Sequence, residues 1–446
     1  MTLAELLVGH PFGDDEDLLH TVDRTVTAGA ARSAARQVAD DLGPLGGMAV
    51  AVQLPNGPEL VSTMVGVWLA GGVYVPVNPR LPELELADVL AATRPVAVIT
   101  NAGTERRDGA EPYPPDVAFV MWTSGTTGAP KAIHHTHTAY LELLDRVLGP
   151  LRSGGDGSRR PSPNLIPVSM ALNAGLYNSL FGLRAGAALV IMDSFEPELF
   201  AALVRRFEIR STVLPPAAMA MLADSAVTDL APLKYLRSIT APLSPLQARR
   251  FAAKFPVYVL NGYGQAEIGE VIGWTAADAK AHPEKIGAVG RPHPGVDLRV
   301  DAAGHLLVRP PNTAAGIEER IDADGFIDTG DLARIDEDGF VWIEGRASDL
   351  INRGGNKVFP DSVEEVLRLS PAISDVAVVA GPDERLGEVP VAFLVGQRVP
   401  DSELDALCRE HLVAYKVPAA YRWIDELPRS EVGKVLRRQL SESLLD

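Results

Sequence analysis

The sequence is short of several features, and each shortage excludes a class of protein. Its 446 residues include one cysteine, Cys408, which excludes an intramolecular disulfide and a cysteine-based zinc site. Basic residues number 41 against 58 acidic ones, so the formal net charge of −17 repels a nucleic-acid backbone. No apolar run approaches the roughly 20 residues that span a bilayer, and the N-terminus carries acids where a signal peptide carries bases. We therefore expect a cytoplasmic protein with no nucleic-acid partner and no membrane span.

The pattern of apolar residues predicts an α/β protein with more than one domain. Helical spacing at 24–42 and 58–71 alternates with short apolar runs at 48–54, 73–77, 96–99 and 119–122, which favours layers around a largely parallel sheet. After Gly287 the pattern changes to short strands and turns, and near Gly345 to a smaller α+β unit. That unit is predicted as a strand at 357–359, a helix at 360–369, a strand at 375–379 and a helix at 402–411. We predict an N-terminal domain of residues 1–344 and a C-terminal domain of residues 345–446.

The segment from Phe119 to Lys131 is the most informative stretch for function. An apolar strand runs into a loop of glycines and hydroxyls that ends at a lysine. Glycines let backbone N–H groups turn toward an anion, hydroxyls add donors, and the lysine supplies a cation. The loop therefore predicts a polyphosphate cradle, although it lacks the Gly-Lys-Ser/Thr of a Walker A motif; a flexible polar turn is the weaker alternative. Its members are Thr123, Ser124, Gly125, Thr126, Thr127, Gly128 and Lys131.

Six segments in order resemble the acyl-adenylate-forming superfamily, which includes acyl-CoA synthetases, adenylation domains of peptide synthetases and luciferases. They are the stretch 70–79 (AGGVYVPVNP), the loop 123–131, the stretch 261–267 (NGYGQAE), Thr329-Gly-Asp331, the hinge motif 345–355 and the lysine motif 428–434. The resemblance implies a large domain of layered α/β subdomains with a small β-barrel-like subdomain, followed by a small mobile α+β domain. It also implies an acid–thiol ligase that uses ATP, Mg²⁺ and CoA, or the phosphopantetheine of an acyl carrier protein.

The resemblance also implies roles for individual residues. Glu267 is expected to hold Mg²⁺, because a hard cation prefers carboxylate oxygen, and Thr126 could add a hydroxyl. Lys434 is expected to bridge ATP and the attacking carboxylate, and Lys131 to act on the phosphates. Tyr263 could stack on adenine, with a core tyrosine as the alternative. The remaining residues expected to bind ATP or AMP are Ala241, Asn261, Gly262, Gly264, Asp331 and Arg346.

The presumed acyl pocket departs from the family pattern. Leu172 stands where amino-acid-activating relatives carry aspartate, and leucine cannot pair with an ammonium group, so an α-amino acid substrate is unfavourable. We expect a small apolar or aromatic carboxylic acid. Glu270 could offer a polar handle there, with a solvated loop carboxylate as the favoured alternative. The other residues assigned to this pocket are Asn173, Leu176, Ile239 and Thr240.

The C-terminal motifs imply a moving domain. Asp349 is expected to be the hinge, and Gly354 and Gly355 to line the thiol tunnel, because a backbone without side chains can approach a pantetheine arm. His134, His135 and His137 invite a metal site, but their spacing does not put all three on one face of a strand or helix. A non-catalytic nucleotide-binding relative is the alternative from a different class, and the retained charged residues argue against it.

Overall fold

The computed structural model describes residues 1–123, 131–152, 161–238, 241, 243–265, 267–314, 317, 320–429 and 435–444. Packing divides the chain into two compact units. The first comprises Met1–Leu243, Ala248–Asp297 and Arg309–Gly325, and the second comprises Ser244–Gln247, Leu298–Val308 and Phe326–Asp446. The domain boundary predicted at Gly345 stays a prediction.

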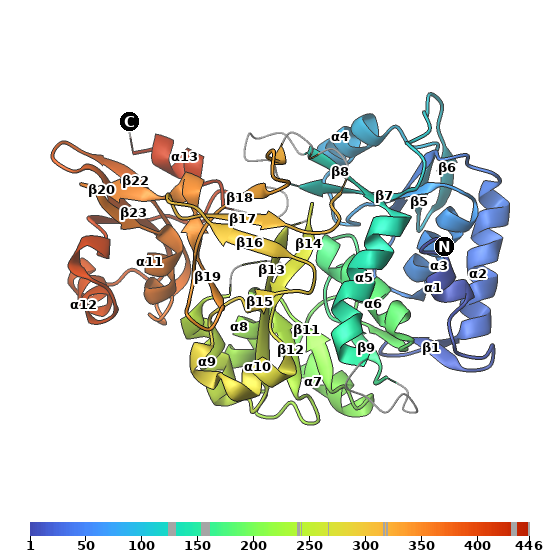
Figure 1. The fold of residues 1–446 in the computed structure, drawn as a ribbon, viewed down its shortest axis with the longest axis horizontal. Helices are drawn as coiled ribbons and strands as arrows, with labels where there is room; N and C mark the ends of the chain where they lie inside the picture. Colours follow the sequence, from blue (N-terminus) through green and yellow to red (C-terminus); the bar gives the residue numbers. More distant parts are fainter. Residues whose placement is uncertain are drawn as a thin grey trace. The chain divides into compact units, whose positions relative to one another are not determined.

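The first unit begins with a sheet whose central strands are parallel (Figure 1). Its order is β6-β5-β3-β4-β7-β8, with bounds β3 (Ala49–Gln53), β4 (Val73–Pro76), β5 (Ala97–Thr100), β6 (Gly103–Arg106), β7 (Val117–Thr123) and β8 (Lys131–Thr136). The helices that accompany it are α2 (Ala28–Leu42), α3 (Pro58–Leu69), α4 (Glu83–Thr93) and α5 (His137–Arg152). Helix α2 starts where the Thr27 hydroxyl accepts the Ala30 N–H at 3.2 Å. A Cβ at Gly66 would lie 2.6 Å from Val38 Cβ, so the glycine allows α2 and α3 to pack closely.

Two further sheets complete the first unit in the described residues. One has the order β2-β1-β10-β9, with β1 (Asp17–His20), β2 (Thr25–Thr27), β9 (Asn164–Ile166) and β10 (Leu189–Ile191), beside α1 (Glu5–Val8) and α6 (Asn173–Ala185). The other has the order β11-β12-β13-β14-β15, with β11 (Ser211–Val213), β12 (Tyr235–Ser238), β13 (Tyr258–Gln265), β14 (Gly269–Gly273) and β15 (Arg291–Pro292). The remaining helices are α7 (Pro197–Arg206), α8 (Pro216–Asp224), α10 (Ala276–Ala281) and the 3₁₀ turn η1 (Pro283–Lys285), together with α9 (Pro245–Lys254), which belongs to this unit from Ala248 onward.

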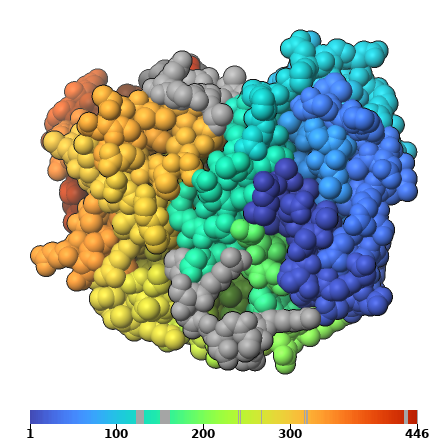
Figure 2. All heavy atoms as spheres, turned by 45° about the vertical axis from the view of Figure 1, so that its right-hand side comes forward, coloured from blue at the N-terminus to red at the C-terminus, as the bar shows by residue number. Residues whose placement is uncertain are grey.

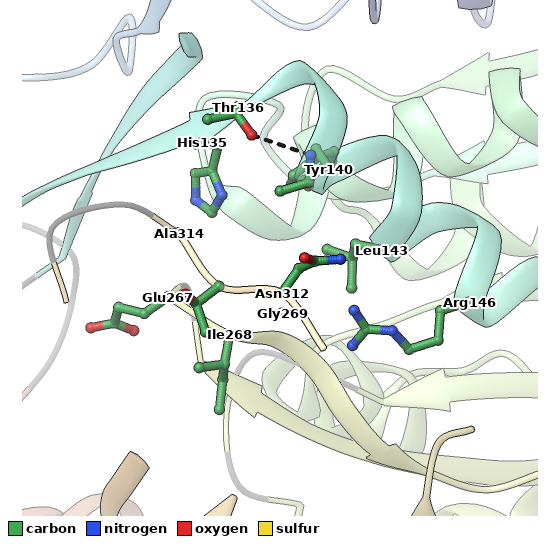
Figure 3. A pocket seen from close by; sticks show the side chains of 12 residues that line it. His135, Thr136, Tyr140, Leu143, Arg146, Glu267, Ile268, Gly269, Asn312 and Ala314 are labelled. Carbon is green, nitrogen blue, oxygen red and sulfur yellow. Dashed lines mark hydrogen bonds between the residues drawn. The ribbon is translucent and has the colours of Figure 1, made fainter. Parts of the chain in front are cut away.

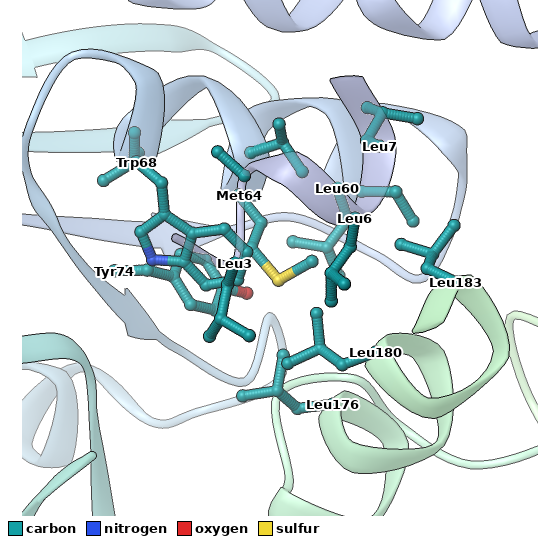
Figure 4. Close-up of a cluster of buried hydrophobic side chains, with 14 of the residues drawn as sticks. Leu3, Leu6, Leu7, Leu60, Met64, Trp68, Tyr74, Leu176, Leu180 and Leu183 are labelled. Atoms are coloured by element: carbon teal, nitrogen blue, oxygen red, sulfur yellow. The ribbon is translucent and has the colours of Figure 1, made fainter. Parts of the chain in front are cut away.

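The N-terminal residues are part of the core of the first unit. Figure 4 shows Leu3, Leu6 and Leu7 meeting leucines of α6 and apolar side chains of α3. The Leu3 N–H also donates to Nδ1 of His137, 134 positions along the chain, at 3.1 Å. In Figure 2 the first residues (dark blue) lie beside the teal segment that includes α5, in agreement with this hydrogen bond.

The second unit contains two sheets in the described residues. The first has the order β16-β17-β18-β19, with β16 (Asp297–Val300), β17 (His305–Arg309), β18 (Ile327–Ile335) and β19 (Val341–Arg346). The second has the order β21-β20-β23-β22, with β24 against β23 and bounds β20 (Ile351–Arg353), β21 (Asn356–Val358), β22 (Ile373–Asp383), β23 (Gly387–Gly396) and β24 (Ala420–Trp423). Its helical segments are η3 (Ala347–Asp349), α11 (Pro360–Leu367), α12 (Asp401–His411), η4 (Ala414–Lys416) and α13 (Arg437–Glu442).

The α/β prediction is confirmed, with strands and helices close to the ranges expected from the apolar pattern. Strand β23 and its parallel partner β24 were not predicted. Among the described residues, no helix has both the length and the apolar character that a bilayer crossing requires.

Candidate active site

The predicted phosphate loop is the connection of a β-hairpin. Strands β7 and β8 are antiparallel, and their register pairs the backbone of Thr123 with that of Lys131. The chain therefore passes from strand through loop to strand, and a helix begins only at His137. This differs from a Walker A loop, which leads directly into a helix. The loop members Ser124, Gly125, Thr126, Thr127 and Gly128 lie outside the described residues, as do Ile239, Thr240 and Lys434.

Glu267 lies in the turn between β13 and β14, where a neighbouring arginine holds its carboxylate. Arg320 Nη1 lies 3.2 Å from Glu267 Oε1, and Arg320 Nη2 donates to Gln265 Oε1 at 3.1 Å. The second oxygen of Glu267, Oε2, makes no hydrogen bond to a described residue. A carboxylate held through one oxygen keeps the other available to a hard cation. Arg320 was not predicted, because nothing local connects it with a residue 53 positions away.

The tight approach of β13 and β14 explains one glycine of the NGYGQAE motif. A Cβ at Gly264 would lie 2.0 Å from the Gly269 carbonyl oxygen, so a side chain cannot be accommodated there. The Asn261 side chain is buried and donates to the Ala288 carbonyl at 3.4 Å, while its Oδ1 accepts the Gly262 N–H at 3.0 Å. The Asn261 side chain therefore stabilises β13 by linking it to the backbone at Ala288.

Tyr263, expected to stack on adenine, and Ala241, expected to bind ATP or AMP, both keep part of their surface accessible. Tyr263 is partly exposed, and its hydroxyl lies 3.5 Å from Gln265 Nε2. Ala241 is exposed. Their roles toward a nucleotide stay predictions.

Asp331 and Arg346 meet across two strands of the second unit. They are register partners on β18 and β19, and Arg346 Nε lies 2.8 Å from Asp331 Oδ1. The carboxylate is buried, whereas the arginine is half exposed. The Thr329 hydroxyl donates to the Leu306 carbonyl at 2.8 Å and accepts the Asp331 N–H at 3.2 Å, which fixes the strand beside the pair.

The predicted hinge residue Asp349 is tied to the C-terminal helix by Arg437. Arg437 Nε lies 3.6 Å from Asp349 Oδ2, and its other nitrogens contact Glu364, Asp361 at 3.0 Å and the Val378 carbonyl at 2.7 Å. Burial, followed by the like charge of Glu364, raises the pKa of Asp361. Arg437 was not singled out from the sequence, although it lies three positions after Lys434.

The glycines assigned to the thiol tunnel form a two-residue hairpin turn. Gly354 and Gly355 have φ angles of +57° and +91° between the paired residues Arg353 and Asn356. Two consecutive positive φ angles define a type I′ turn, which strongly favours glycine. The turn is therefore a structural reason for both glycines, beside the role that the resemblance implies.

The predicted acyl-pocket residues on α6 differ in their surroundings. Leu172 precedes the helix and is 46% exposed, and Asn173 is its first residue. Leu176 is fully buried in the hydrophobic cluster of Figure 4. This packing gives Leu176 a structural role, and its contact with an acyl group stays a prediction.

Glu270 is a buried charge in β14, so the solvated-loop alternative was wrong. Its Oε2 lies 3.1 Å from Arg237 Nη1, and its Oε1 lies 3.1 Å from His293 Nε2. Burial alone would raise the pKa of Glu270, but Arg237 and then His293 lower it below its ordinary value. A Cβ at Gly273 would lie 2.6 Å from Glu270 Oε1, so this glycine makes room for the cluster.

The three histidines after the phosphate loop do not share a site. His135 stacks on Phe119, with ring centroids 4.6 Å apart, and His137 accepts the Leu3 N–H. Among the described residues, no group of three or more histidine, cysteine or acidic side chains is arranged to hold a metal ion. Burial lowers the pKa of His135 to about 4, so this ring is neutral at physiological pH.

A small cavity lies between α5 and the segments that follow β13 and β17. Figure 3 shows His135, Tyr140 and Arg146 extending from β8 and α5 toward the chain that carries Glu267 and Asn312. The carboxylate of Glu267 points away from Arg146 in this view. The sequence contained no signal for this cavity, since its walls come from three distant segments.

Comparison with known proteins matches nearly the whole chain. A family model described as AMP-binding enzyme matches residues 12–112 and 102–317, and one described as AMP-binding enzyme C-terminal domain matches residues 362–434. The 2,3-dihydroxybenzoate–AMP ligase of Bacillus subtilis is 32% identical, covering 82% of this chain and 72% of that protein. The 4-coumarate–CoA ligase 1 of Arabidopsis thaliana is 29% identical, covering 92% and 86%.

Solved structures show the same fold. The o-succinylbenzoate CoA synthetase of Bacillus subtilis, solved with its acyl-adenylate intermediate, superposes with a TM-score of 0.84. The match covers 98% of this chain and 97% of that one at 24% identity. At this identity the likeness establishes the architecture.

Proposed function

The chain belongs to the family of AMP-binding enzymes and is an AMP-forming acid–thiol ligase, and from that premise we propose its reaction. The first half-reaction joins a non-amino carboxylic acid to the α-phosphate of ATP, giving acyl-AMP and releasing pyrophosphate. In the second, a thiol loses its proton and attacks the acyl carbon, and AMP leaves. We propose CoA as the thiol; a carrier-protein phosphopantetheine is the alternative acceptor.

One observation carries the proposal. The first unit contains both the hairpin that closes at Lys131 and the carboxylate of Glu267, held by Arg320 through a single oxygen. Such an arrangement suits phosphoryl transfer, where catalysis is mostly positioning and charge stabilisation. The donor chemistry of Glu267 fits Mg²⁺, which when bound would neutralise charge on the phosphates. In the second unit, the buried Asp331 can accept hydrogen bonds from ribose hydroxyls, and Arg346 fixes its orientation.

A panel of apolar and aromatic carboxylic acids with ATP and magnesium tests the proposal, with hydroxamate trapping and pyrophosphate release as readouts. We expect Glu267→Gln to lower adenylation by about 10²–10³-fold, since it removes the charge and keeps the size. Glu337→Gln, at an exposed position, is the control. If no acid yields pyrophosphate, the alternative of a non-catalytic nucleotide-binding relative replaces the ligase.

We also propose that residues 345–446 move about Asp349 between the two half-reactions. Lys434 would serve adenylation, and Gly354 and Gly355 the approach of the thiol. Lys434→Ala should then abolish formation of acyl-AMP from acid and ATP, while the variant still converts supplied acyl-AMP to thioester. Equal loss of both half-reactions in a folded variant would contradict the alternation.

A further inference from the structure

The chain on either side of Lys434 is fixed, although Lys434 itself lies outside the described residues. The Leu436 N–H donates to the Pro428 carbonyl at 2.8 Å. Arg429 and Val435, the next residues inward, form an antiparallel bridge. These contacts close a loop that contains the lysine, and its base is set by the residues at which the loop begins and ends.

Arg437 follows this loop and is held by groups of α11 and β22. Its Nη1 donates to Glu364 Oε1 and to the Val378 carbonyl, the latter at 2.7 Å. Its Nη2 donates to Asp361 Oδ1 at 3.0 Å. Glu364 is buried, and its Oε1 also accepts the Val378 N–H at 2.8 Å. Because the guanidinium is a planar fork, two fixed nitrogens also fix the direction of the third, Nε.

The Nε of Arg437 faces the residue predicted to be the hinge. It lies 3.6 Å from Asp349 Oδ2, and the other oxygen, Oδ1, accepts the Ser348 hydroxyl at 2.8 Å. Both side chains of this ion pair keep part of their surface accessible. A partly exposed pair at this distance contributes little to stability, so it can break and form again at low cost. Arg437 therefore has strong contacts on one side and an exchangeable contact with the hinge on the other.

The hairpin of Gly354 and Gly355, assigned to the thiol, is held by a different set of contacts. At its base, Arg353 Nη1 donates to the carbonyls of Tyr415 and Val417 at 2.8 and 3.0 Å. A change at the contact with the hinge should therefore affect the part of the chain that carries the lysine and leave the hairpin in place.

We propose that Arg437 is a positioning residue that couples the hinge at Asp349 to the segment that carries Lys434. The inference rests on the proposed function and adds the residue through which the hinge and the lysine act together. A turn of the backbone at Asp349 moves its carboxylate, whereas Arg437 stays with α11 and β22, so the ion pair exists in only one orientation of the hinge. This orientation is the one for adenylation, because the arginine belongs to the chain that positions the lysine, and adenylation depends on that position.

The ratio of the two half-reactions tests the coupling. Asp349→Asn removes the charge, keeps the size and leaves Arg437 its contacts with α11, so the fold is retained. We expect pyrophosphate release from acid and ATP to fall by about three- to tenfold, while conversion of supplied acyl-AMP to thioester stays within about twofold of the wild-type rate. Arg368→Gln is the matched control, since the ion pair of Arg368 is with Glu364 Oε2, at 3.0 Å, rather than with the hinge. Equal loss of both half-reactions, or loss of neither, overturns the proposal.

A double-variant cycle shows whether Asp349 acts through Arg437. Arg437→Lys keeps a cation for Glu364 and Asp361, but it has a single ammonium in place of three directed nitrogens. We expect this variant to lower the half-reaction ratio as Asp349→Asn does, and the combined variant to lower it no further. If the two effects multiply, the two residues act independently and the coupling is wrong.

Hydrogen exchange separates failure of the coupling from failure of the ligase. Without substrates, the amides of residues 346–351 should exchange faster in Asp349→Asn and in Arg437→Lys than in the wild-type protein or in Arg368→Gln. If the wild-type protein activates no acid, the proposed function fails, and this measurement still decides whether Arg437 restrains the hinge. Unchanged exchange in both variants overturns the proposal.

Discussion

Two buried polar clusters in the first unit differ in how completely they are satisfied. In the closed cluster, Glu270 is bonded by Arg237 on one side and His293 on the other. In the open cluster, His135, Tyr140 and Arg146 line a cavity with polar atoms that have no described partner. Both clusters contain an arginine and a histidine, and the closed cluster has a buried carboxylate between them.

Buried polar groups therefore affect stability in two different ways, depending on whether they have hydrogen-bond partners. A satisfied network stabilises one packing arrangement, and removing a member leaves an uncompensated charge. Buried polar groups without a partner lower stability until a water molecule or another polar group bonds them. The two clusters should therefore respond in opposite ways to the loss of one group.

The largest effect is expected from breaking the closed cluster. Glu270→Ala leaves Arg237 buried without its partner and should lower the free energy of unfolding by about 3–5 kcal/mol. Because the pKa of Glu270 is lowered, its contribution is present above the ordinary value of 4.5 and is lost as pH falls below it. Urea unfolding at pH 7 measures the loss, with the exposed Asp88→Ala as control. A loss no larger than that of the control would show that the cluster is not stabilising.

An intermediate effect is expected from pH acting on the open cluster. Since the folded-state pKa of His135 is about 4 and its unfolded value is 6.5, the unfolded chain binds more protons between these values. Stability should therefore fall as pH drops from 6.5 to 4, by about 3 kcal/mol for this residue. His135→Phe should reduce the slope of unfolding free energy against pH by about one proton. His10, whose pKa is also lowered to about 4, keeps its own share of the slope in both proteins. If the wild-type protein and His135→Phe have identical slopes, the His135 ring is accessible to solvent in the folded protein.

The smallest effect is expected from removing a single hydroxyl of the open cluster. Tyr140→Phe deletes a group without a described partner, so the free energy of unfolding should change by less than about 0.5 kcal/mol, or rise. Tyr421→Phe is the matched variant, since that hydroxyl lies 2.9 Å from Asp405 Oδ1, and it should cost about 1 kcal/mol. Chemical unfolding of both variants decides the point. A larger loss for Tyr140→Phe would mean that its hydroxyl is already satisfied.

Local sequence patterns predicted helices and strands better than they predicted which side chains contact each other. Apolar periodicity indicated α2 and α3, because the spacing that identifies a helix lies within one continuous segment of sequence. The resemblance assigned Asp331 and Arg346 to nucleotide binding, but their contact with each other arises from the register of β18 and β19 and was not predicted. Arg320 and Arg437 were missed, since each meets its carboxylate only through tertiary folding.

The burial of Glu270 could not be predicted from the sequence around it. A glutamate between glycine and valine reads as a solvated turn, and the residues that compensate its charge lie 33 positions before it and 23 after it. Nothing in the neighbouring sequence indicates such partners. The cavity between α5 and the loop at Asn312 escaped notice for the same reason.

The hydrogen bond between Leu3 and His137 has a consequence for how the chain folds during synthesis. Leu3 can make this bond only after the chain has been synthesised as far as His137, 134 positions later. Leu3, Leu6 and Leu7 can meet α3 before that, but their contacts with α6 form later still. Contacts of such long sequence separation form slowly. An apolar segment whose packing is completed so late is partly exposed to aggregation and to chaperones in the meantime.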